Sequence, residues 1–200
     1  MGRVSTVKER LLQVAFDLIS QNSYGGVSVD DMCERANVKK GSFYHFFPSK
    51  SDLAVAAYEE HWQQRRPNYD RMFSPLVPPL ERIENYCKAI YEGQREKKAK
   101  TGRVLGCPFA SVGCELSTQD EKIRQKAEEM FARYCLYIEN ALRDAQKEGL
   151  IEACDFAQKS RMIHSLTMGM MLQAKVKNDP EVLRDLTPAI LQMIGAVVTA

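Results

Sequence analysis

The sequence predicts an all-α protein of about nine helices, with a small N-terminal helix-turn-helix unit followed by a larger helical domain. Apolar residues recur at helical spacing in almost every segment of the 200 residues. Helix-start signals are also present: Ser28 with Asp31, and Ser49 with Asp52, each place an acidic side chain three residues after a serine. This is the spacing of a capping box. The two observations together indicate a mostly helical fold.

The N-terminal unit begins with a predicted helix that has Leu11, Ala15 and Leu18 on one face. A break follows at Gly25-Gly26, because glycine weakens a helix and favours turns.

The next two helices are short and are separated by a tight turn. The first of them has one apolar face, made of Val29, Met32, Cys33 and Ala36. Asn37 tolerates the left-handed backbone that ends such a helix, and Val38 fills the turn. Pro48 ends the next helix because it lacks a backbone N–H and disfavours a helical Phe47. Two short helices joined in this way predict a helix-turn-helix.

The second helix of this pair has the charge expected of a nucleic-acid-binding element. Between Arg35 and Lys50 the chain has four basic residues and no acidic one. Lys39, Lys40 and Gly41 crowd its N-terminal end, where backbone N–H groups and the helix dipole favour a phosphate. Taken alone, the same residues also fit a solvated lysine pair beside an ordinary aromatic core.

The segment from Arg10 to Leu53 resembles the N-terminal domain of TetR-family transcriptional regulators. The resemblance rests on the order RLLQVAFDLI, GGVSVDDMCERANV and KKGSFYHFFPSKSDL. It implies a DNA-binding domain of residues 1–48 and an effector-sensing and dimerisation domain of residues 49–200. It also implies two partners, namely a double-stranded DNA operator with an inverted repeat and a second copy of the chain.

The resemblance assigns candidate DNA contacts residue by residue. Positions that hold phosphates in the family correspond to Ser42, Tyr44 and Lys50. Positions that reach or approach base edges correspond to Lys39, Lys40, Gly41 and His45. We add Ser28, at the start of the first helix of the pair. The chain departs from many relatives at Phe46 and Pro48, and these departures concern base contacts near the end of the recognition helix.

Composition and charge narrow the class of protein. The formal charge of +2 is small, so DNA binding should depend on local geometry more than on bulk charge.

No signal peptide opens the chain and no apolar run approaches membrane-spanning length, so we expect a cytoplasmic protein with no membrane partner. The six cysteines are then mostly reduced thiols. No cysteine pair or histidine has metal-ligand spacing, so we expect neither a metal nor a cofactor.

Six helices are predicted after residue 48, at Ser49–Arg66, Leu80–Lys98, Gly106–Leu116, Asp120–Lys147, Phe156–Lys177 and Glu181–Val198. The last two combine small residues with more apolar surface than one packed face requires. Periodicity fits a monomer core and a dimer surface equally well. The resemblance favours the dimer, because TetR-type regulators dimerise through their last two long helices.

The larger domain contains residues of the kind that line small-ligand pockets. Tyr86, Tyr134 and His164 are apolar rings with polar tips. Aromatic residues at helical spacing are also ordinary core residues. These residues identify no ligand, so the effector remains an unknown small molecule.

A second resemblance concerns cysteine chemistry. Leu105-Gly106-Cys107, Val112 to Leu116 and LQAK ending at Lys175 resemble the TetR subgroup that includes the repressor of N-ethylmaleimide reductase. It implies that Cys107 responds to electrophiles and oxidants and that Lys175 lies close to it. We add Cys114 as a candidate second reactive thiol. A Gly-Cys helix start and a buried lysine also fit scaffold features of the wider subgroup, including members that sense other compounds. A thiol at a helix start near an ammonium group does have a lowered pKa.

The rival hypothesis is a cysteine-dependent enzyme that acts on electrophiles through Cys107. Such an enzyme needs a base and an orienting group beside the thiol, and only His164 has a suitable helical position. The chain has no phosphate loop and no dinucleotide fingerprint. We therefore expect a regulator without catalytic residues.

Overall fold

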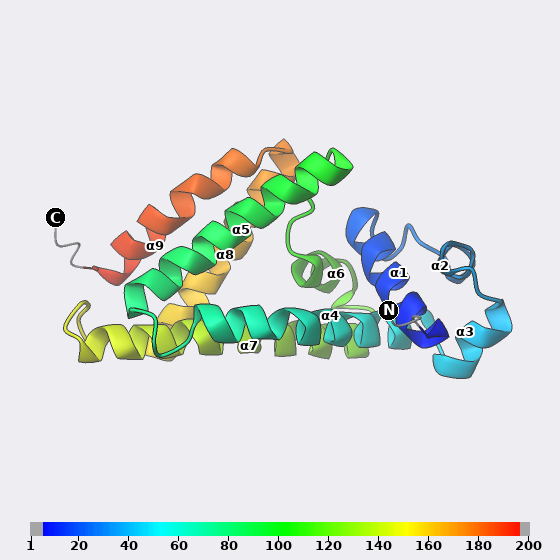
Figure 1. The fold of residues 1–200 in the computed structure, drawn as a ribbon, viewed down its shortest axis with the longest axis horizontal. Coiled ribbons are helices and arrows are strands. Elements are labelled where there is room, and N and C mark those ends of the chain that lie inside the picture. Colours follow the sequence, from blue (N-terminus) through cyan, green and yellow to red (C-terminus); the bar gives the residue numbers. More distant parts are fainter. Residues whose placement is uncertain (1–5, 197–200) are drawn as a thin grey trace, which may run out of the picture. The chain divides into compact units, whose positions relative to one another are not determined.

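The computed structural model describes residues 6–196, and all regular structure in this range is helical. The elements are α1 (Val7–Gln21), α2 (Val29–Ala36), α3 (Lys40–Phe46), α4 (Lys50–Met72), α5 (Pro79–Thr101), α6 (Pro108–Leu116), α7 (Glu121–Lys147), α8 (Phe156–Lys177), the 3₁₀ helix η1 (Pro180–Asp185) and α9 (Leu186–Ile194) (Figure 1). The predicted all-α class is confirmed. Between residues 6 and 196, no helix combines the length and apolar character needed to cross a membrane.

Four helices differ from their predicted bounds by two residues or more. α5 ends at Thr101 instead of Lys98, and α6 begins at Pro108 instead of Gly106.

α4 continues through Pro67 to Met72 instead of ending near Arg66. A proline inside a helix costs about 3 kcal/mol, but the continuation allows Tyr69 and Met72 to pack against the apolar core.

The last helix also differs from its prediction. It opens as the 3₁₀ turn η1 with Pro180 near its start, and α9 ends at Gly195, whose φ is 62°. The predicted end at Val198 lies outside the described residues.

The chain folds into two compact units that exchange segments. Of the described residues, unit 1 contains residues 6–66 together with Pro108–Glu129, and unit 2 contains Pro67–Cys107 together with residues 130–196. The predicted functional division at residue 48 stays a prediction, since compactness groups the helix-turn-helix with α6 and the beginnings of α4 and α7.

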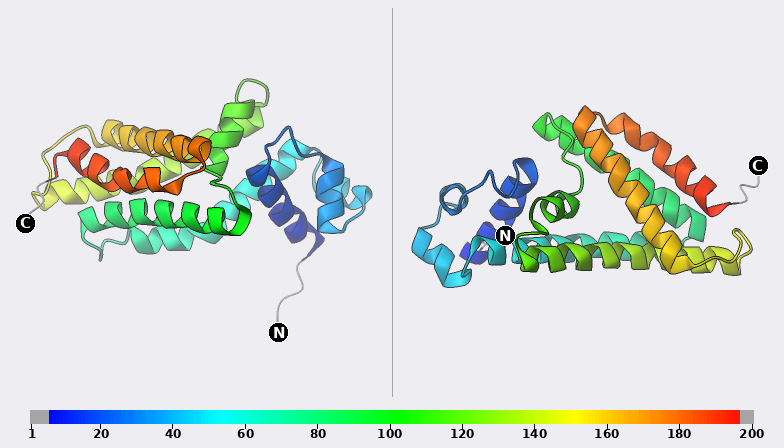
Figure 2. Two further views of the ribbon diagram at one scale, coloured as in Figure 1. Left: turned by 90° about the horizontal axis from the view of Figure 1, so that it is seen from above. Right: turned by 180° about the vertical axis from the view of Figure 1, so that it is seen from behind.

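In unit 1, α1 packs against α2 and α3 (Figure 2). Capping boxes start α1 at Thr6 and α2 at Ser28, as the side chain of each accepts a bond from a backbone N–H three residues on. The core of these helices consists of fully or nearly fully buried side chains: Leu11, Ala15, Ile19, Met32, Phe43 and Leu53. Burial of these apolar faces is the main force that holds three short helices together.

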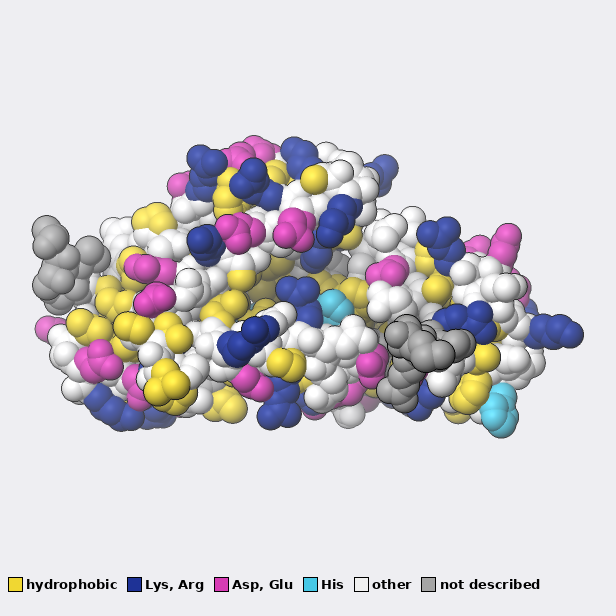
Figure 3. Space-filling model, viewed as in Figure 1, with side chains coloured by type: hydrophobic (Ala, Val, Ile, Leu, Met, Phe, Trp, Pro, Cys, Tyr) yellow, Lys and Arg dark blue, Asp and Glu magenta, His cyan; other side chains and the backbone are white. Residues whose placement is uncertain are grey.

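Unit 2 has a separate apolar core. Its helices α5, α8 and α9 contact one another in part directly and in part through η1. The core is made of Phe73, Ile83, Tyr86, Cys87, Ile138, Ala141, Leu142, Ala145, Ile151, Ile163, Leu186, Ile190 and Ile194. Over α5 and the turn from α8 to α9, Lys and Arg side chains alternate with Asp and Glu (Figure 3).

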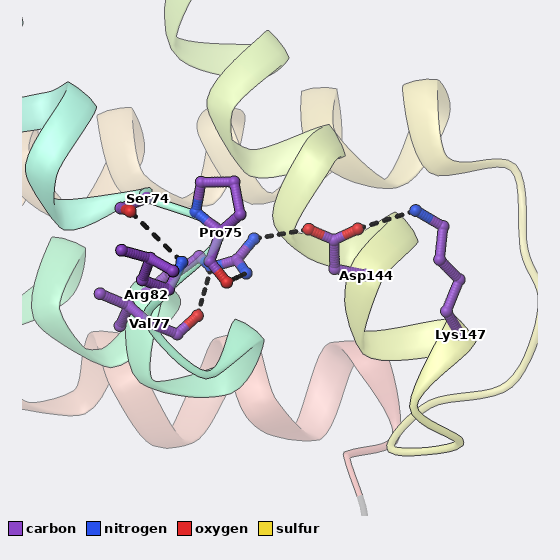
Figure 4. A network of polar contacts seen from close by, with 7 residues as sticks. Ser74, Pro75, Val77, Arg82, Asp144 and Lys147 are labelled. Atoms are coloured by element: carbon purple, nitrogen blue, oxygen red, sulfur yellow. Dashed lines mark hydrogen bonds and ion pairs between the residues drawn. The ribbon is translucent and has the colours of Figure 1, made fainter.

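A buried arginine organises the connection between α4 and α5. The guanidinium of Arg82 donates to Asp144 at 2.7 Å and to the carbonyls of Val77 and Pro75 at 2.7 and 3.3 Å (Figure 4). Lys147 also binds Asp144, at 2.9 Å. These hydrogen bonds hold the pKa of Asp144 below its ordinary value, with the Arg82 bond as the largest cause. A buried charge needs such partners, so this network fixes the loop that precedes α5.

Candidate DNA interface and sensing loop

The turn between α2 and α3 is built by local geometry. Asn37 has a φ of 50°, and the N–H of Val38 bonds the carbonyl of Cys33 at 2.9 Å. At a helix end of this kind, the N–H groups of the two residues after the helix bond to carbonyl groups of its last turn. The chain leaves it extended through Lys39 and enters α3 at Lys40. The predicted helix-turn-helix is therefore present.

α3 has one buried and one exposed face. Phe43 is fully buried and Phe47, just after the helix, is 4% exposed, whereas Tyr44 is 52% exposed. The exposed candidates are Lys39, Lys40, Gly41, Tyr44 and His45, while Ser42 is half-buried. Two phenylalanines thus anchor the helix, and most residues predicted to touch DNA face away from the core. Basic side chains and a histidine side chain lie over α2 and α3 in Figure 3.

Lys40 is paired within the structure. Its Nζ lies 2.8 Å from the Oδ1 of Asp30, and the hydrogen bond to Asp30 raises the pKa of Lys40. Both side chains are well exposed, so the pair adds little stability. A phosphate or a base edge can therefore compete with Asp30 for the ammonium group at small cost.

Ser28 and Lys50 have intramolecular roles at the two ends of the motif. The Ser28 hydroxyl accepts from the N–H of Asp31 and donates to its carboxylate. The Nζ of Lys50 donates to the carbonyl of Tyr24 and lies 3.9 Å from the centre of the Tyr24 ring. Burial lowers the pKa of Lys50. Both side chains hold the motif together, and their contacts with DNA stay predictions.

One important residue was missed by sequence reasoning. The carboxylate of Glu115, near the end of α6, accepts from the backbone N–H of Tyr24 at 3.0 Å and of Gly25 at 2.6 Å. A Cβ on Gly25 would lie 3.0 Å from this carboxylate, which explains the first glycine of the break. The break was visible in the sequence, but nothing in it pointed to a partner 90 residues away.

The predicted sensing cysteine, Cys107, is the last residue of a loop that is held by hydrogen bonds from two distant side chains. Gln94 of α5 makes two bonds with Gly106, donating to its carbonyl at 3.1 Å and accepting from its N–H at 3.0 Å. Asn178, just after α8, accepts from the N–H of Val104 at 2.8 Å and donates to the carbonyl of Gly102 at 3.1 Å. We call residues 102–107 the sensing loop.

The structure brings Lys175 to this loop. Gly106 has a φ of 71°, and a Cβ there would lie 3.3 Å from the Cδ of Lys175. The lysine stem therefore packs on the residue that precedes Cys107. Cys107 is 8% exposed and is followed directly by Pro108, the first residue of α6.

All three aromatic candidates belong to unit 2, and two of them are in contact. Tyr134 and His164 are stacked, with ring centres 5.8 Å apart and an interplanar angle of 17°. Burial lowers the pKa of His164 to about 4, and neither of its buried ring nitrogens has a hydrogen-bond partner among residues 6–196. Tyr86 is buried, which raises the pKa of its phenol well above the ordinary value, and Thr167 bonds this side chain.

The remaining thiols differ in environment. Cys114 lies on α6 in unit 1 and is exposed, so the structure does not group it with the aromatic candidates of unit 2. Burial raises the pKa of Cys33 and Cys135, and raises that of Cys87 to about 11. Among residues 6–196, no group of three or more His, Cys, Asp or Glu side chains forms a site suited to a metal ion.

Comparison with known proteins decides the family. Residues 11–57 match the model of bacterial regulatory proteins of the tetR family, and residues 79–190 match the tetracyclin repressor-like C-terminal domain. The chain belongs to the TetR family. The second match alone covers more than half of the chain.

Relatives of this TetR-family protein are transcriptional regulators. The HTH-type transcriptional repressor NemR of Escherichia coli is 24% identical over 190 residues, which cover 94% of each chain. An uncharacterized HTH-type transcriptional regulator of Lactococcus lactis is 30% identical over 128 residues, or 62% of each chain.

Solved structures share the fold of this TetR-family protein. Reduced NemR of E. coli superposes with a TM-score of 0.83 at 23% identity and covers 96% of this chain and 99% of its own. TetR of Rhodobacter sphaeroides superposes with a TM-score of 0.84 at 24% identity and covers 94% and 99%. These findings support a DNA-binding transcriptional regulator and not the cysteine-dependent enzyme.

Proposed function

We propose that this TetR-family protein is a homodimeric, cytoplasmic repressor that binds an inverted-repeat operator and releases it when a thiol is modified or a small molecule binds. The observation that carries the DNA-binding part is the two-faced α3 helix. Its aromatic anchors are buried, and Lys39, Lys40, Gly41 and Tyr44 remain exposed. Two relatives, NemR and DhaR, are named transcriptional repressors, which supports repression as the mode of regulation.

An apolar stripe on α8 supports the dimer. Met162, Leu172 and Val176 are 46, 62 and 77% exposed, and a Cβ on Gly169 would meet nothing within 4 Å. These four positions are separated by seven, three and four residues, so they lie on one helical face. Exposed apolar side chains in a row on one helix are typical of a surface that another chain covers.

The packing around Gly106 supports Cys107 as the sensing thiol. Lys175 and Gln94 both contact Gly106, so a group added to the neighbouring sulfur has to displace closely packed atoms. Cys107 is bonded directly to Pro108, the first residue of α6. The small-molecule alternative is supported by Tyr86, Tyr134 and His164, because the two ring nitrogens of His164 accept and donate no hydrogen bond within the described part of the chain.

Operator binding tests the first part of the proposal. Lys40→Ala should weaken binding by about 1–3 kcal/mol and relax base preference, while Tyr44→Phe and Lys50→Ala should weaken binding to all sequences. Lys8→Ala, an exposed lysine on α1, is the matched control. If no inverted repeat is preferred over random DNA by the wild type, this part of the proposal is wrong.

Thiol modification tests the second part. N-ethylmaleimide or hypochlorite should release operator from wild type and from Cys114→Ser, but not from Cys107→Ser, with the modified residue identified by mass spectrometry. Lys175→Met should slow the reaction of Cys107, because a nearby ammonium favours the thiolate. If Cys107→Ser releases DNA as readily as wild type, the non-covalent pocket replaces the thiol switch.

A further inference from the structure

A groove of about 300 Å³ lies between α1 and α4 in unit 1. Its lining residues are Glu9, Leu12, Gln13, Phe16, Ala57, Glu60, His61 and Gln64. None of them belongs to α3, to the sensing loop or to the aromatic candidates of unit 2. The groove is therefore separate from every residue used in the proposed function.

The groove has an apolar side with flat rings. Leu12 and Ala57 are 7 and 2% exposed. The rings of Phe16 and His61 are stacked, with centres 3.7 Å apart and an interplanar angle of 15°. An apolar or aromatic group can bury against these four side chains, and the faces of aromatic rings also attract cations.

The lysine, arginine and carboxylate content of the groove is one-sided. Among the residues that the structure describes, the lining has two carboxylates, Glu9 and Glu60, and no lysine or arginine. Glu9 accepts from the backbone N–H of Thr6 at 2.9 Å, and Gln64 donates to Glu60 at 3.1 Å. Both donors are uncharged, so neither bond neutralises its carboxylate.

We propose that this groove binds an organic cation that has a flat apolar body. The cationic nitrogen would lie between the carboxylates of Glu9 and Glu60, and the body would cover Phe16 and His61. A volume of about 300 Å³ is at the lower end of the range for small-molecule sites, which selects a ligand of one ring and a short substituent. The two carboxylates repel anions. They attract a cation more strongly than a neutral molecule of the same shape.

Such a ligand acts on the DNA-binding helices themselves. α1 packs against α2 and α3, and α4 begins four residues after α3 ends. A molecule bound in the groove contacts both α1, which packs against the helix-turn-helix, and α4, which follows it in the chain. It therefore links these two helices. This effect does not pass through Cys107.

The test uses the full chain and its single tryptophan. Trp62 is 4% exposed and lies next to His61 in α4, so its fluorescence reports on changes in this part of α4, and isothermal titration calorimetry measures binding directly. Benzyltrimethylammonium is titrated without DNA, in parallel with the neutral isostere neopentylbenzene and the anion benzylsulfonate. We expect a saturable change with the cation, and at least tenfold weaker binding of the other two probes.

Two charge-removing variants keep the local hydrogen bonds. Glu9→Gln retains the acceptor of the capping box, and Glu60→Gln retains an acceptor for Gln64. Each should weaken cation binding by about fivefold or more, because a close charge pair that is well screened by water contributes at least this much, and the double variant should bind the cation no better than the neutral isostere. Glu34→Gln, an exposed glutamate on α2, is the matched control and should bind like wild type.

Three results would overturn the proposal. Equal affinity for the cation and the neutral isostere would show that the charge of the ligand does not contribute to binding. Wild-type affinity in the Glu9→Gln, Glu60→Gln double variant would place the cation elsewhere. Loss of the cation response in Cys107→Ser would show that the site depends on the sensing loop. An unchanged response in that variant supports the groove whether or not Cys107 is the sensing thiol.

Discussion

Gly41 is a glycine that the fold itself does not require. A Cβ at this position would meet no atom within 4 Å, and its φ is not in the left-handed region. A close approach by an external backbone, such as that of DNA, gives a reason for the missing side chain. Fold stability and operator binding should therefore respond in opposite directions to a substitution here.

We predict that Gly41→Ala stabilises the protein and weakens operator binding. Alanine in a helix is more favourable than glycine by about 0.5–1 kcal/mol, whereas its methyl group should obstruct the DNA contact. Urea unfolding and operator titration measure the two effects. An unchanged operator affinity would show that DNA does not approach Gly41 closely.

His164 makes the stability of the protein depend on pH. Burial holds its pKa at about 4, below the ordinary value of 6.5. The unfolded chain therefore binds a proton more readily than the folded chain between these values. His164 therefore leaves the unfolding free energy unchanged above pH 6.5 and lowers it as the pH falls toward 4.

We predict that the unfolding free energy decreases by about 3 kcal/mol over this window because of His164. His164→Phe keeps a ring to pack on Phe131 and Tyr134 and removes the titrating group. Its unfolding free energy should therefore be less dependent on pH, as measured by urea titration between pH 4 and 7. His45→Phe, at an exposed position, should retain the wild-type dependence.

At the scale of elements, α6 is joined at both ends to parts of the proposed mechanism. Its first residue, Pro108, follows Cys107, and Glu115 near its end holds the N–H groups of Tyr24 and Gly25. Between them, a Cβ on Gly113 would lie 3.1 Å from the Cβ of Ala127 on α7. α6 is thus packed too closely on α7 to move independently of it.

We predict that Glu115→Ala destabilises the protein by about 1–3 kcal/mol, since it removes the acceptor of two backbone N–H groups. Glu115→Gln keeps one acceptor oxygen and should lie between the alanine variant and wild type. Urea unfolding measures both, with Glu34→Ala as a control at an exposed glutamate. If the alanine variant is as stable as wild type, water satisfies these N–H groups equally well.

At the scale of the whole molecule, the proposed dimer depends on the exposed stripe of α8. Leu172 belongs to this stripe and is 62% exposed in the single chain. Covering such a side chain on both copies contributes about 3–4 kcal/mol to association. Two-fold symmetry places the same patch on each partner, so one substitution affects the interface twice.

We predict that Leu172→Glu weakens dimerisation by about a hundredfold or more and weakens operator binding with it. Light scattering over a range of protein concentrations measures the assembly. Leu76→Glu makes the same chemical change at a loop residue that is 95% exposed and should leave the dimer intact. Equal association by both variants would place the dimer surface elsewhere.

The sequence alone determined the features that depend on residues within about four positions of one another. The apolar spacing of α7 and α8, the caps at Ser28 and Ser49, and the left-handed turn at Asn37 are all of this kind. Local hydrogen bonds and helical periodicity do not require a partner from elsewhere in the chain. The helix-turn-helix could therefore be predicted from local sequence, whereas the candidate DNA contacts on α3 were assigned from the family resemblance.

The tertiary structure decided which residues the side chains on each helix contact. α4 continues past Pro67 because Tyr69 and Met72 find a core to pack against, and the bonds between Glu115 and the turn at Gly25 join residues 90 positions apart. The bonds from Gln94 and Asn178 to the sensing loop have the same origin. Local sequence fixes the direction of a side chain on its own helix, but the identity of its partner depends on how distant helices pack.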